Sequence, residues 1–380
     1  MKEISIRGSK NFCLWLLMLV SLSCGSANHS SGSNPPKGFI SFDDARIQYE
    51  GRIGKNKREA AELYWSGSAA RIRFQGTGMK ALLEDYNGQN YFNIIIDGTN
   101  IRKVKIDSAK HWYLLAENLS PGEHVVELFK LTQINQEYKR GYTRFYGFQP
   151  ENGEVLPAPA LKKRKIEFYG NSITCGHAVE DTSGADSGAS MFENNYLSYA
   201  AITARHFNAQ YSCIAVSGIG LMAGFRKLIM PEMYYLRNPF DSTDRWNFSL
   251  YTPDVVVVNL LQNDEGVIGR PDSEPFKRRF GSVAPSDEFI IDAYKSFISK
   301  LRSHYPVANI ICVLGNMGIT RTGSKWPGLV QEATRQLSDQ KVHTLFFKYK
   351  GTPGHPNRNE QKTMADSLIN FIQTTTHWDK

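Results

Sequence analysis

The chain has 380 residues, which is enough for two domains of ordinary size. Its 41% hydrophobic and 22% charged residues are the values of a globular protein. The net charge of +8 is spread along the chain, and the one tight basic run, Lys162–Lys165, falls in a predicted linker without any nucleic-acid-binding motif. We therefore predict no nucleic-acid partner.

Residues 1–23 are predicted to be a signal peptide. A basic start precedes the apolar stretch Phe12–Val20, which is too short to span a membrane as a helix. Cys24 follows in a setting that resembles the lipidation site of a bacterial lipoprotein, and residues 24–37 would serve as a flexible tether. We expect an exported lipoprotein whose only membrane contact is the lipid on Cys24. Ordinary secretion is the alternative.

Three cysteines lie beyond the export segment, namely Cys175, Cys213 and Cys312. An odd, widely spaced set makes no disulfide framework, and the chain contains no Cys-x-x-Cys pair. All three fall in or beside predicted strands, so we predict that they are small buried hydrophobic residues. No metal and no organic cofactor is expected.

Residues 38–150 are predicted to form a β-sandwich of the jelly-roll type. Short runs with strand alternation are separated by turn signals, and no convincing helical pattern interrupts them. Tyr64, Trp65 and Trp112 would be able to stack on a sugar ring, but such side chains more often belong to a core, and we predict the core position. The clearest strands are Ala70–Phe74, Tyr91–Ile96, Ile101–Ile106 and His124–Leu131.

Residues 151–164 are predicted to be a linker, and the pattern changes at Lys165. From there to residue 380, strand and helix patterns alternate, which predicts a doubly wound α/β domain of the flavodoxin type with five parallel strands. The predicted strands are Ile166–Tyr169, Tyr211–Val216, Asp254–Leu261, Asn309–Leu314 and His343–Tyr349. The predicted helices are Asn195–Phe207, Asp287–His304, Trp326–Gln340 and Glu360–Thr374.

Four polar or glycine positions come directly after predicted strands. Ser172 follows the first strand, Gly218 the second, Asn263 the third and His355 the fifth. Because ligands bind at the carboxyl edge of an open α/β sheet, we expect these four residues to meet there. For Ser172 alone, a simpler interpretation is that Asn171 and Ser172 make a turn and cap a helix.

Together these residue types are typical of acyl transfer. A serine hydroxyl needs a base to take its proton, and His355 lies in a late strand-end loop. A tetrahedral oxyanion needs fixed donors, which the N–H groups of Ser172 and Gly218 and the side-chain amide of Asn263 would supply. We therefore predict Ser172 as nucleophile, His355 as general base, and Ser172, Gly218 and Asn263 as the oxyanion hole.

These residues occur in the order typical of the SGNH, or GDSL-like, hydrolases. The chain more closely resembles carbohydrate esterase family 2, whose members join an N-terminal jelly roll to an SGNH domain. The resemblance implies a serine esterase that removes acetyl groups from plant polysaccharides such as xylan or mannan, with acetylated carbohydrate as its partner and no predicted oligomeric state. It is carried by the blocks Ile166–Gly176, Tyr196–Ala200 and Ser217–Leu221.

Two positions depart from the family pattern. Leu261 stands where the block around Asn263 usually reads Gly-x-Asn-Asp, so we expect this loop to differ. Thr352 stands three residues before His355, where the superfamily usually has an Asp that orients the histidine. The predicted site therefore contains no acid, and either a backbone carbonyl holds the ring or the site is impaired. A non-catalytic carbohydrate-binding lipoprotein that keeps the esterase fold is the alternative function.

Overall fold

The structure, a computed structural model, begins its description at Gly38. The predicted signal peptide 1–23, the tether 24–37 and the lipidation site Cys24 lie outside the described residues, and these assignments stay predictions. Within the part of the chain that is described, no helix has the length and apolar character needed to cross a membrane. The described ranges are 38–56, 59–135, 140–376 and 378.

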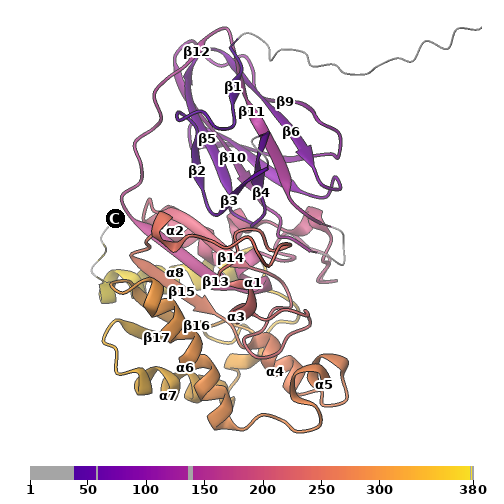
Figure 1. Ribbon diagram of the computed structural model, residues 1–380, viewed down its shortest axis with the longest axis vertical. Coiled ribbons are helices and arrows are strands. Elements are labelled where there is room, and N and C mark those ends of the chain that lie inside the picture. Colours follow the sequence, from indigo (N-terminus) through magenta and orange to yellow (C-terminus); the bar gives the residue numbers. More distant parts are fainter. Residues whose placement is uncertain (1–37, 57–58, 136–139, 377, 379–380) are drawn as a thin grey trace, which may run out of the picture. The chain divides into compact units, whose positions relative to one another are not determined.

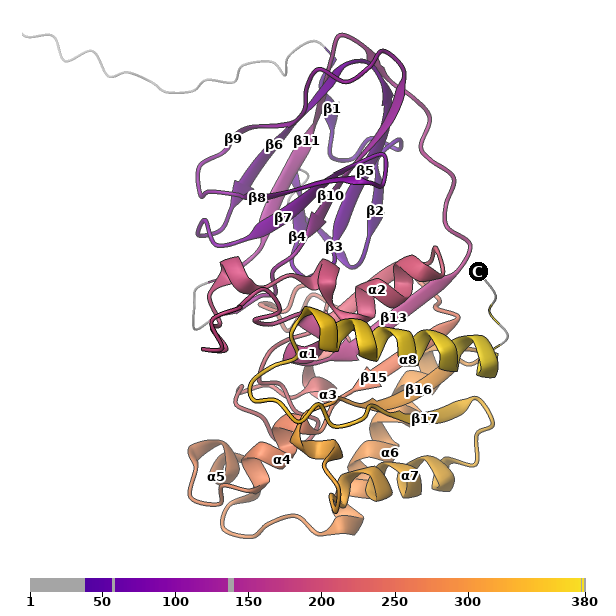
Figure 2. The same ribbon diagram turned by 180° about the vertical axis from the view of Figure 1, so that it is seen from behind.

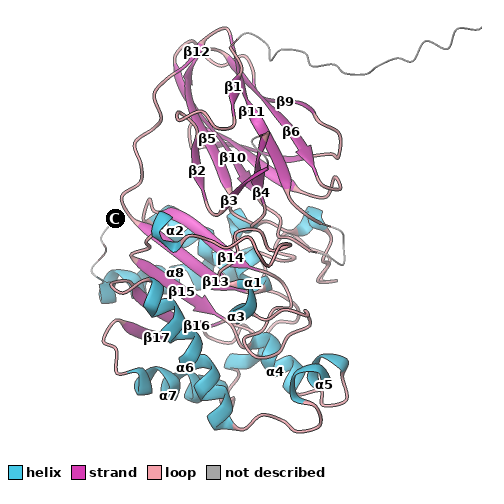
Figure 3. Ribbon diagram, in the orientation of Figure 1, coloured by secondary structure: helices cyan, strands magenta, loops and turns pink. Residues whose placement is uncertain are grey.

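The first part of the described chain consists of strands. Their bounds are β1 (Ile40–Ser41), β2 (Gln48–Glu50), β3 (Ile53–Asn56), β4 (Ala60–Leu63), β5 (Ala69–Gln75), β6 (Gly78–Asp85), β7 (Tyr91–Ile96), β8 (Asn100–Lys105), β9 (His111–Ala116), β10 (Glu123–Lys130), β11 (Thr143–Glu151) and β12 (Glu154–Val155). They form two antiparallel sheets, which Figures 1 and 3 show facing each other. One sheet has the order β3-β4-β11-β6-β9 with β1 on β11, and the other has the order β12-β5-β10-β7-β8 with β2 on β5.

The inner faces of these two sheets share one apolar core. Phe74 on β5 and Phe92 on β7 come from one sheet and Phe145 on β11 comes from the other, and all three are fully buried. Their burial follows the period-two alternation of the strands, and the predicted β-sandwich is confirmed. Because β12 pairs with β5, the sandwich continues into the predicted linker 151–164.

The aromatic residues singled out in this region differ in their positions. Tyr64 and Trp65 are buried, as predicted. The core prediction is wrong for Trp112, which is 36% exposed on β9. The reason is the alternation of the strand, since the neighbouring Tyr113 points into the core and Trp112 therefore points outward, where it contacts Phe39 edge to face.

The second part of the chain alternates strands and helices. The strands are β13 (Lys165–Gly170), β14 (Gln210–Ala215), β15 (Val255–Asn259), β16 (Asn309–Leu314) and β17 (Val342–Phe346). The helices are α1 (Ser172–Cys175), α2 (Tyr199–His206), α3 (Met230–Met233), α4 (Gln262–Ile268), α5 (Glu274–Phe280), α6 (Asp287–His304), α7 (Trp326–Leu337) and α8 (Arg358–Thr376), with short 3-10 turns at Ser190–Phe192, Asn195–Leu197, Phe248–Leu250 and Gly318–Thr320.

Among the described residues these strands form one parallel sheet with the order β14-β13-β15-β16-β17. This order confirms the predicted five-stranded flavodoxin-type sheet. Helices α6 and α7 cover one face of the sheet, whereas α2 and α8 cover the other (Figures 1 and 2). The central strand β15 is therefore buried from both sides, which explains its run of four valines.

Several predicted bounds agree with the structure. Helix α6 and strand β16 have the predicted limits. The predicted helix Asn195–Phe207 is instead divided, because Ser198 is the N-cap of α2 and its hydroxyl accepts a hydrogen bond from the N–H of Ala201 at 3.2 Å. The cysteines Cys175, Cys213 and Cys312 are free and buried, as predicted.

Candidate active site

Ser172 is the first residue of α1, which begins directly after β13 and the cap residue Asn171. Asn171 is the N-cap of α1, and its Oδ1 accepts a hydrogen bond from the N–H of Ile173 at 3.1 Å. A Cβ atom on Gly170 would lie 2.1 Å from Oγ1 of Thr174, so a glycine is needed for the helix to fold back over the strand end. The capping interpretation is therefore right for Asn171, while the hydroxyl of Ser172 points to a different partner.

That partner is His355, in the loop between β17 and α8. Oγ of Ser172 lies 2.8 Å from Nε2 of His355. Ser172 is 7% exposed and the side chain of His355 is 20% exposed, so the pair is largely buried but still accessible from solvent. The fold thus brings the predicted nucleophile and the predicted base within hydrogen-bond distance of each other.

A carboxylate holds the other nitrogen of the His355 ring. Nδ1–H of His355 donates to the two oxygens of Asp186 at 2.9 and 2.8 Å, and the backbone N–H of His355 donates to the same carboxylate at 3.0 Å. An ionised carboxylate only accepts hydrogen bonds, so Nδ1 carries the proton and Nε2 offers its lone pair to Ser172. The hydrogen bond from His355 lowers the pKa of Asp186 to about 2 against the opposing effect of burial, which keeps the carboxylate ionised.

This acid does not come from the usual chain position. Thr352 stands there, and its hydroxyl contacts Nζ of Lys350 at 2.7 Å and the carboxylate of Glu360. The prediction of a site without an acid, with a backbone carbonyl holding the ring, is corrected by Asp186, which lies between α1 and α2. The sequence offered only a weak signal, because Asp186 shares its Gly- and Ser-rich stretch with other acids and no spacing distinguishes it.

The loop that carries Asp186 is folded by Asp181. Oδ1 of Asp181 accepts hydrogen bonds from the N–H and the hydroxyl of Ser183 at 2.9 and 2.5 Å. Oδ2 of Asp181 accepts from the N–H of Ser187 at 2.7 Å. Asp186 itself has a φ of 55°, in the left-handed region that Asp tolerates better than most residues. The carboxylate beside His355 therefore depends on a loop held by local hydrogen bonds.

Gly218 opens the loop after β14, with a φ of 78° that favours glycine. The buried carboxylate of Asp264 fixes this loop, because it accepts hydrogen bonds from the N–H groups of Leu221, Met222 and Ala223 at 2.8, 2.7 and 2.9 Å. Burial raises the pKa of Asp264, and the three donors oppose that effect. Within the described residues the N–H of Gly218 has no protein acceptor.

Asn263 lies in the first turn of α4, after β15. Its Nδ2 donates to the carbonyl of Ile219 at 2.7 Å, which leaves the second N–H of the amide available. Ser172, Gly218 and Asn263 thus follow three neighbouring strands at the same edge of the sheet, as their positions predicted.

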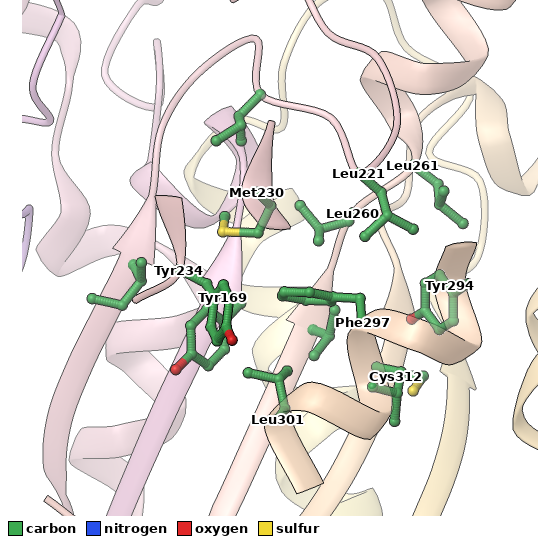
Figure 4. Packing of buried hydrophobic residues seen from close by; sticks show 14 of the residues in the cluster. Tyr169, Leu221, Met230, Tyr234, Leu260, Leu261, Tyr294, Phe297, Leu301 and Cys312 are labelled. Atoms are coloured by element: carbon green, nitrogen blue, oxygen red, sulfur yellow. The ribbon is translucent and has the colours of Figure 1, made fainter. Parts of the chain in front are cut away.

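Leu261 has a left-handed backbone with a φ of 80°. Its side chain is fully buried in the apolar cluster that also contains Leu221 and Tyr294 (Figure 4). The loop was expected to differ because a leucine replaces the usual glycine. The structure has a backbone that suits glycine together with a buried side chain that glycine lacks.

A second histidine lies against the first. The ring centroids of His177 and His355 are 4.5 Å apart, and Nδ1 of His177 lies 3.4 Å from Oε1 of Glu193 and 3.5 Å from Oγ of Ser217. Burial would raise the pKa of Glu193, but Arg140 and His177 together outweigh this effect, and the pKa is lowered to about 2. Since Arg140 lies three residues before the start of the sandwich strand β11, a buried charge pair connects the sandwich to the site.

His177, Asp186 and His355 are also the one group of side chains, within the described ranges, that could jointly ligate a metal ion. However, both ring nitrogens of His355 already face hydrogen-bond partners, Asp186 on one side and Ser172 on the other. This is the arrangement of a general base with an orienting acid, and the hydrogen bonds account for the cluster.

Two hollows border these residues. One of about 560 Å³ lies between the loop after α1 and the loop of His355, and acids such as Glu180 and Glu360 line it. The other, of about 350 Å³, has Val216 and Phe225 in its lining. His355 and Asp186 line the first hollow, whereas the second is lined by Phe225, whose N–H donates to the carbonyl of Gly218.

Comparison with known proteins supports one family. Residues 49–159 match the carbohydrate esterase 2 N-terminal family. The chain is 34% identical over 350 residues to the cellulase/esterase CelE of Acetivibrio thermocellus, but this match, which covers 88% of the chain, spans only 40% of the length of CelE. It is 24% identical over 376 residues to an acetylxylan esterase / glucomannan deacetylase of Cellvibrio japonicus, and this match covers 96% of the chain and 98% of that protein.

The fold is similar to that of a family two carbohydrate esterase from Clostridium thermocellum solved in complex with cellohexaose. The TM-score is 0.77 at 32% sequence identity, and the match covers 88% of this chain and 100% of that one. Since both parts of the fold and the whole of that relative are matched, the chain belongs to carbohydrate esterase family 2, a family of carboxylic ester hydrolases.

Proposed function

We propose that this protein is a serine esterase that removes acetyl groups from plant cell-wall polysaccharide of the xylan or mannan type. The observation that carries the proposal is the chain of contacts from Ser172 through His355 to Asp186. The substrate class is supported by the relative from Cellvibrio japonicus, which is an acetylxylan esterase / glucomannan deacetylase.

In the first half of the reaction, Oγ of Ser172 attacks the acetyl carbonyl carbon and its proton passes to Nε2 of His355. The carbonyl oxygen becomes an oxyanion, and we assign its stabilisation to the N–H groups of Ser172 and Gly218 and to Nδ2 of Asn263. When the tetrahedral intermediate collapses, the sugar oxygen leaves with the proton from Nε2, and the acetyl group stays on Ser172.

In the second half, water attacks the acetyl carbonyl carbon and gives its proton to Nε2 of His355. Oγ of Ser172 then leaves and takes this proton back, and the product leaves as acetic acid, which ionises to acetate in water. In both halves the carboxylate of Asp186 keeps the proton on Nδ1 and stabilises the positive charge that the ring acquires.

The same carboxylate weakens the case for a non-catalytic carbohydrate-binding protein. That alternative was based on Thr352, which stands where an orienting acid is usual, and on Leu261. Asp186 supplies an acid to His355, and Leu261 keeps a backbone that suits glycine. Neither departure therefore removes a group that the reaction requires.

The test is the hydrolysis of an aryl acetate and the release of acetate from acetylated xylan and glucomannan. We expect Ser172→Ala to lower kcat by about 10⁶-fold, as for other serine hydrolases. Asp186→Asn should lower kcat by up to about 10⁴-fold with little change in KM, because an amide stabilises the wrong tautomer of His355.

Thr352→Val is the matched control for the acid. It removes the hydroxyl at the usual acid position without changing the contact between His355 and Asp186, so we expect a rate close to that of the wild type. A Ser172→Ala protein with unchanged activity would show that the nucleophile is wrong. Full activity of Asp186→Asn would instead disprove only the role of that carboxylate and would leave the nucleophile assignment intact.

A further inference from the structure

The smaller hollow is lined by Phe225 and Arg226, which lie beside the glycine assigned to the oxyanion hole. A Cβ atom on Gly218 would lie 3.4 Å from Cβ of Phe225 and 3.5 Å from Nε of Arg226. The N–H of Phe225 donates to the carbonyl of Gly218 at 2.8 Å, and Nε of Arg226 donates to the carbonyl of Ser217 at 2.8 Å. The lining of this hollow is therefore hydrogen-bonded to the loop that carries Gly218.

The hollow combines an apolar floor with an exposed aromatic ring. Ile134, Val216 and Met233 contribute to its lining, and Phe225 is 43% exposed beside them. Its volume of about 350 Å³ is of the size that holds a small ligand. Because pyranose rings have apolar faces that pack on aromatic side chains, these surfaces suit a sugar ring.

The charged residues that the structure describes in the lining of this hollow are all cations. Arg226, Lys227 and Arg278 line it, and within the described residues no carboxylate does. The guanidinium of Arg270 lies 5.8 Å from the ring centroid of Phe225, which adds a further positive charge near the opening. An acetyl ester is neutral, so its hydrolysis does not require this concentration of positive charge.

The fixed position of one of these cations supports a binding role. Nη2 of Arg278 donates to the carbonyls of Arg226 at 2.9 Å and Gly224 at 3.3 Å, which ties α5 to the loop after β14. Nη1 of Arg278 pairs with Glu274, but that carboxylate is 72% exposed and such a surface pair contributes little. Lys227 and Arg278 thus give this hollow a positive potential that would attract a carboxylate.

We propose that this hollow binds a uronic acid residue of the polysaccharide, so that the preferred substrate is an acetylated polysaccharide that carries uronic acid groups. The inference rests on the proposed function, because it places this sugar beside the acetylated one. The acids of the larger hollow repel such a group, so its binding on the Gly218 side also sets the direction in which the polysaccharide lies across Ser172.

The test compares acetylated glucuronoxylan with the same polymer after its carboxyl groups have been reduced to alcohols. For each protein, the ratio of the two kcat/KM values is measured, together with the rate on a neutral aryl acetate. We expect the wild type to prefer the acidic polymer by about fivefold at low salt. This preference should fall towards one at about 1 M salt, where charges are screened within about 3 Å.

Lys227 is the residue to change, because within the described ranges its side chain has no hydrogen-bond or ion-pair partner and its loss disturbs no other contact. Lys227→Gln should lower the preference for the acidic polymer by about two- to fivefold, and Lys227→Glu should lower it further. Lys300→Gln is the matched control. Lys300 is an exposed cation near the end of α6, at the opposite edge of the sheet, and its change should leave the ratio as in the wild type.

Equal rates on the two polymers in the wild type, or a Lys227→Glu protein with an unchanged ratio, would overturn the inference. A wild type that does not hydrolyse the aryl acetate would instead overturn the proposed function. In that case, binding of a xylo-oligosaccharide with one glucuronic acid to the Ser172→Ala protein still tests the hollow by calorimetry. Tighter binding than that of the carboxyl-reduced oligosaccharide supports the inference, and equal binding overturns it.

Discussion

His355 is oriented by a carboxylate that comes from a different loop than its own. A histidine base needs an acceptor on Nδ1 at the right distance and angle, and the chemistry does not depend on where in the chain that acceptor originates. Asp186 provides this acceptor, while the hydroxyl of Thr352 is engaged by Lys350 and Glu360. His355, which we propose as the base, therefore has an acid partner even though the usual acid position lacks one.

Leu261 presents a conflict between backbone and side chain. A leucine with a positive φ is strained by about 1–2 kcal/mol, because Cβ approaches the carbonyl oxygen that follows. The same side chain is fully buried, and burying a leucine contributes about 1.5–3 kcal/mol. The gain from burial exceeds the strain, which explains how a leucine persists here.

This conflict predicts an unusual order of stability for two variants. Leu261→Ala and Leu261→Gly both lose the buried side chain, at a cost of about 2–5 kcal/mol. Only the glycine variant loses the strain, so we expect it to be more stable than the alanine variant by about 1 kcal/mol in urea unfolding. Leu260 is the control, because it is also fully buried but has no positive φ. At this position we expect the alanine variant to be more stable than the glycine variant. The same order at both positions would contradict the role of strain.

At the level of elements, the site consists of loops that leave the carboxyl ends of parallel strands. The strand β13 ends at a glycine that lets α1 start at once, so Ser172 stays at the sheet edge. The loop after α1 then returns to the same edge with Asp186. This loop has no regular structure, and its shape depends on the hydrogen bonds that Asp181 accepts from Ser183 and Ser187.

We predict that Asp181→Ala lowers kcat by about tenfold to 100-fold without changing the urea midpoint of unfolding. A small displacement of Asp186 misorients His355, and misplacements of about 1 Å can cost 10²-fold in rate. Asn247→Ala is the control, because Asn247 accepts the same pair of hydrogen bonds from Ser249 but precedes β15, at the other edge of the sheet. Reduced stability with unchanged kcat in the Asp181 variant would mean that the loop does not position the acid.

At the level of the whole molecule, the sandwich and the parallel sheet share buried charges. Arg52 on the sandwich side donates to Glu167 of β13 at 3.1 Å, and both side chains are fully buried. Arg140 pairs in the same way with Glu193 beside the site. Removing one partner of such a pair leaves an uncompensated buried charge, so the two parts of the fold depend on each other for stability.

The pair of Glu193 and Arg140 predicts a defined dependence of stability on pH. The pKa of Glu193 is lowered to about 2 from an ordinary value of 4.5, so the folded state binds this proton less well than the unfolded state. The ionised carboxylate therefore adds to the free energy of unfolding. This contribution is fully present above about pH 4.5 and is lost as the pH falls through about 2.

In the Glu193→Gln variant the side chain cannot ionise, so the variant lacks this contribution to the free energy of unfolding. We expect the variant to be less stable than the wild type by about 3–5 kcal/mol at pH 7. The difference should narrow as the pH falls from about 4.5 towards 2, as measured by urea unfolding at a series of pH values. A difference that stays constant over this range would show that Glu193 is not held ionised by the fold.

Much of the fold could be predicted from the sequence, because the signals are local. The four valines of β15 and the apolar period of α6 identify a buried strand and a covering helix without knowledge of their neighbours. The rule that ligands bind at the carboxyl edge then placed Ser172 and His355 together before their contact was known. The prediction for Trp112 was wrong because the alternation of a strand assigns its residues to two faces, but does not tell which face packs on the core.

By itself, then, the sequence determined the two-part architecture and the meeting of Ser172 and His355 at one sheet edge, because periodicity and strand ends are properties of short stretches. Only the tertiary structure decided which carboxylate orients His355, how Leu261 is accommodated, and that Arg140 reaches the site from the sandwich. The physical reason is that each of these depends on distances between residues far apart in the chain. Such distances follow from loop conformation and packing, and no local pattern encodes them.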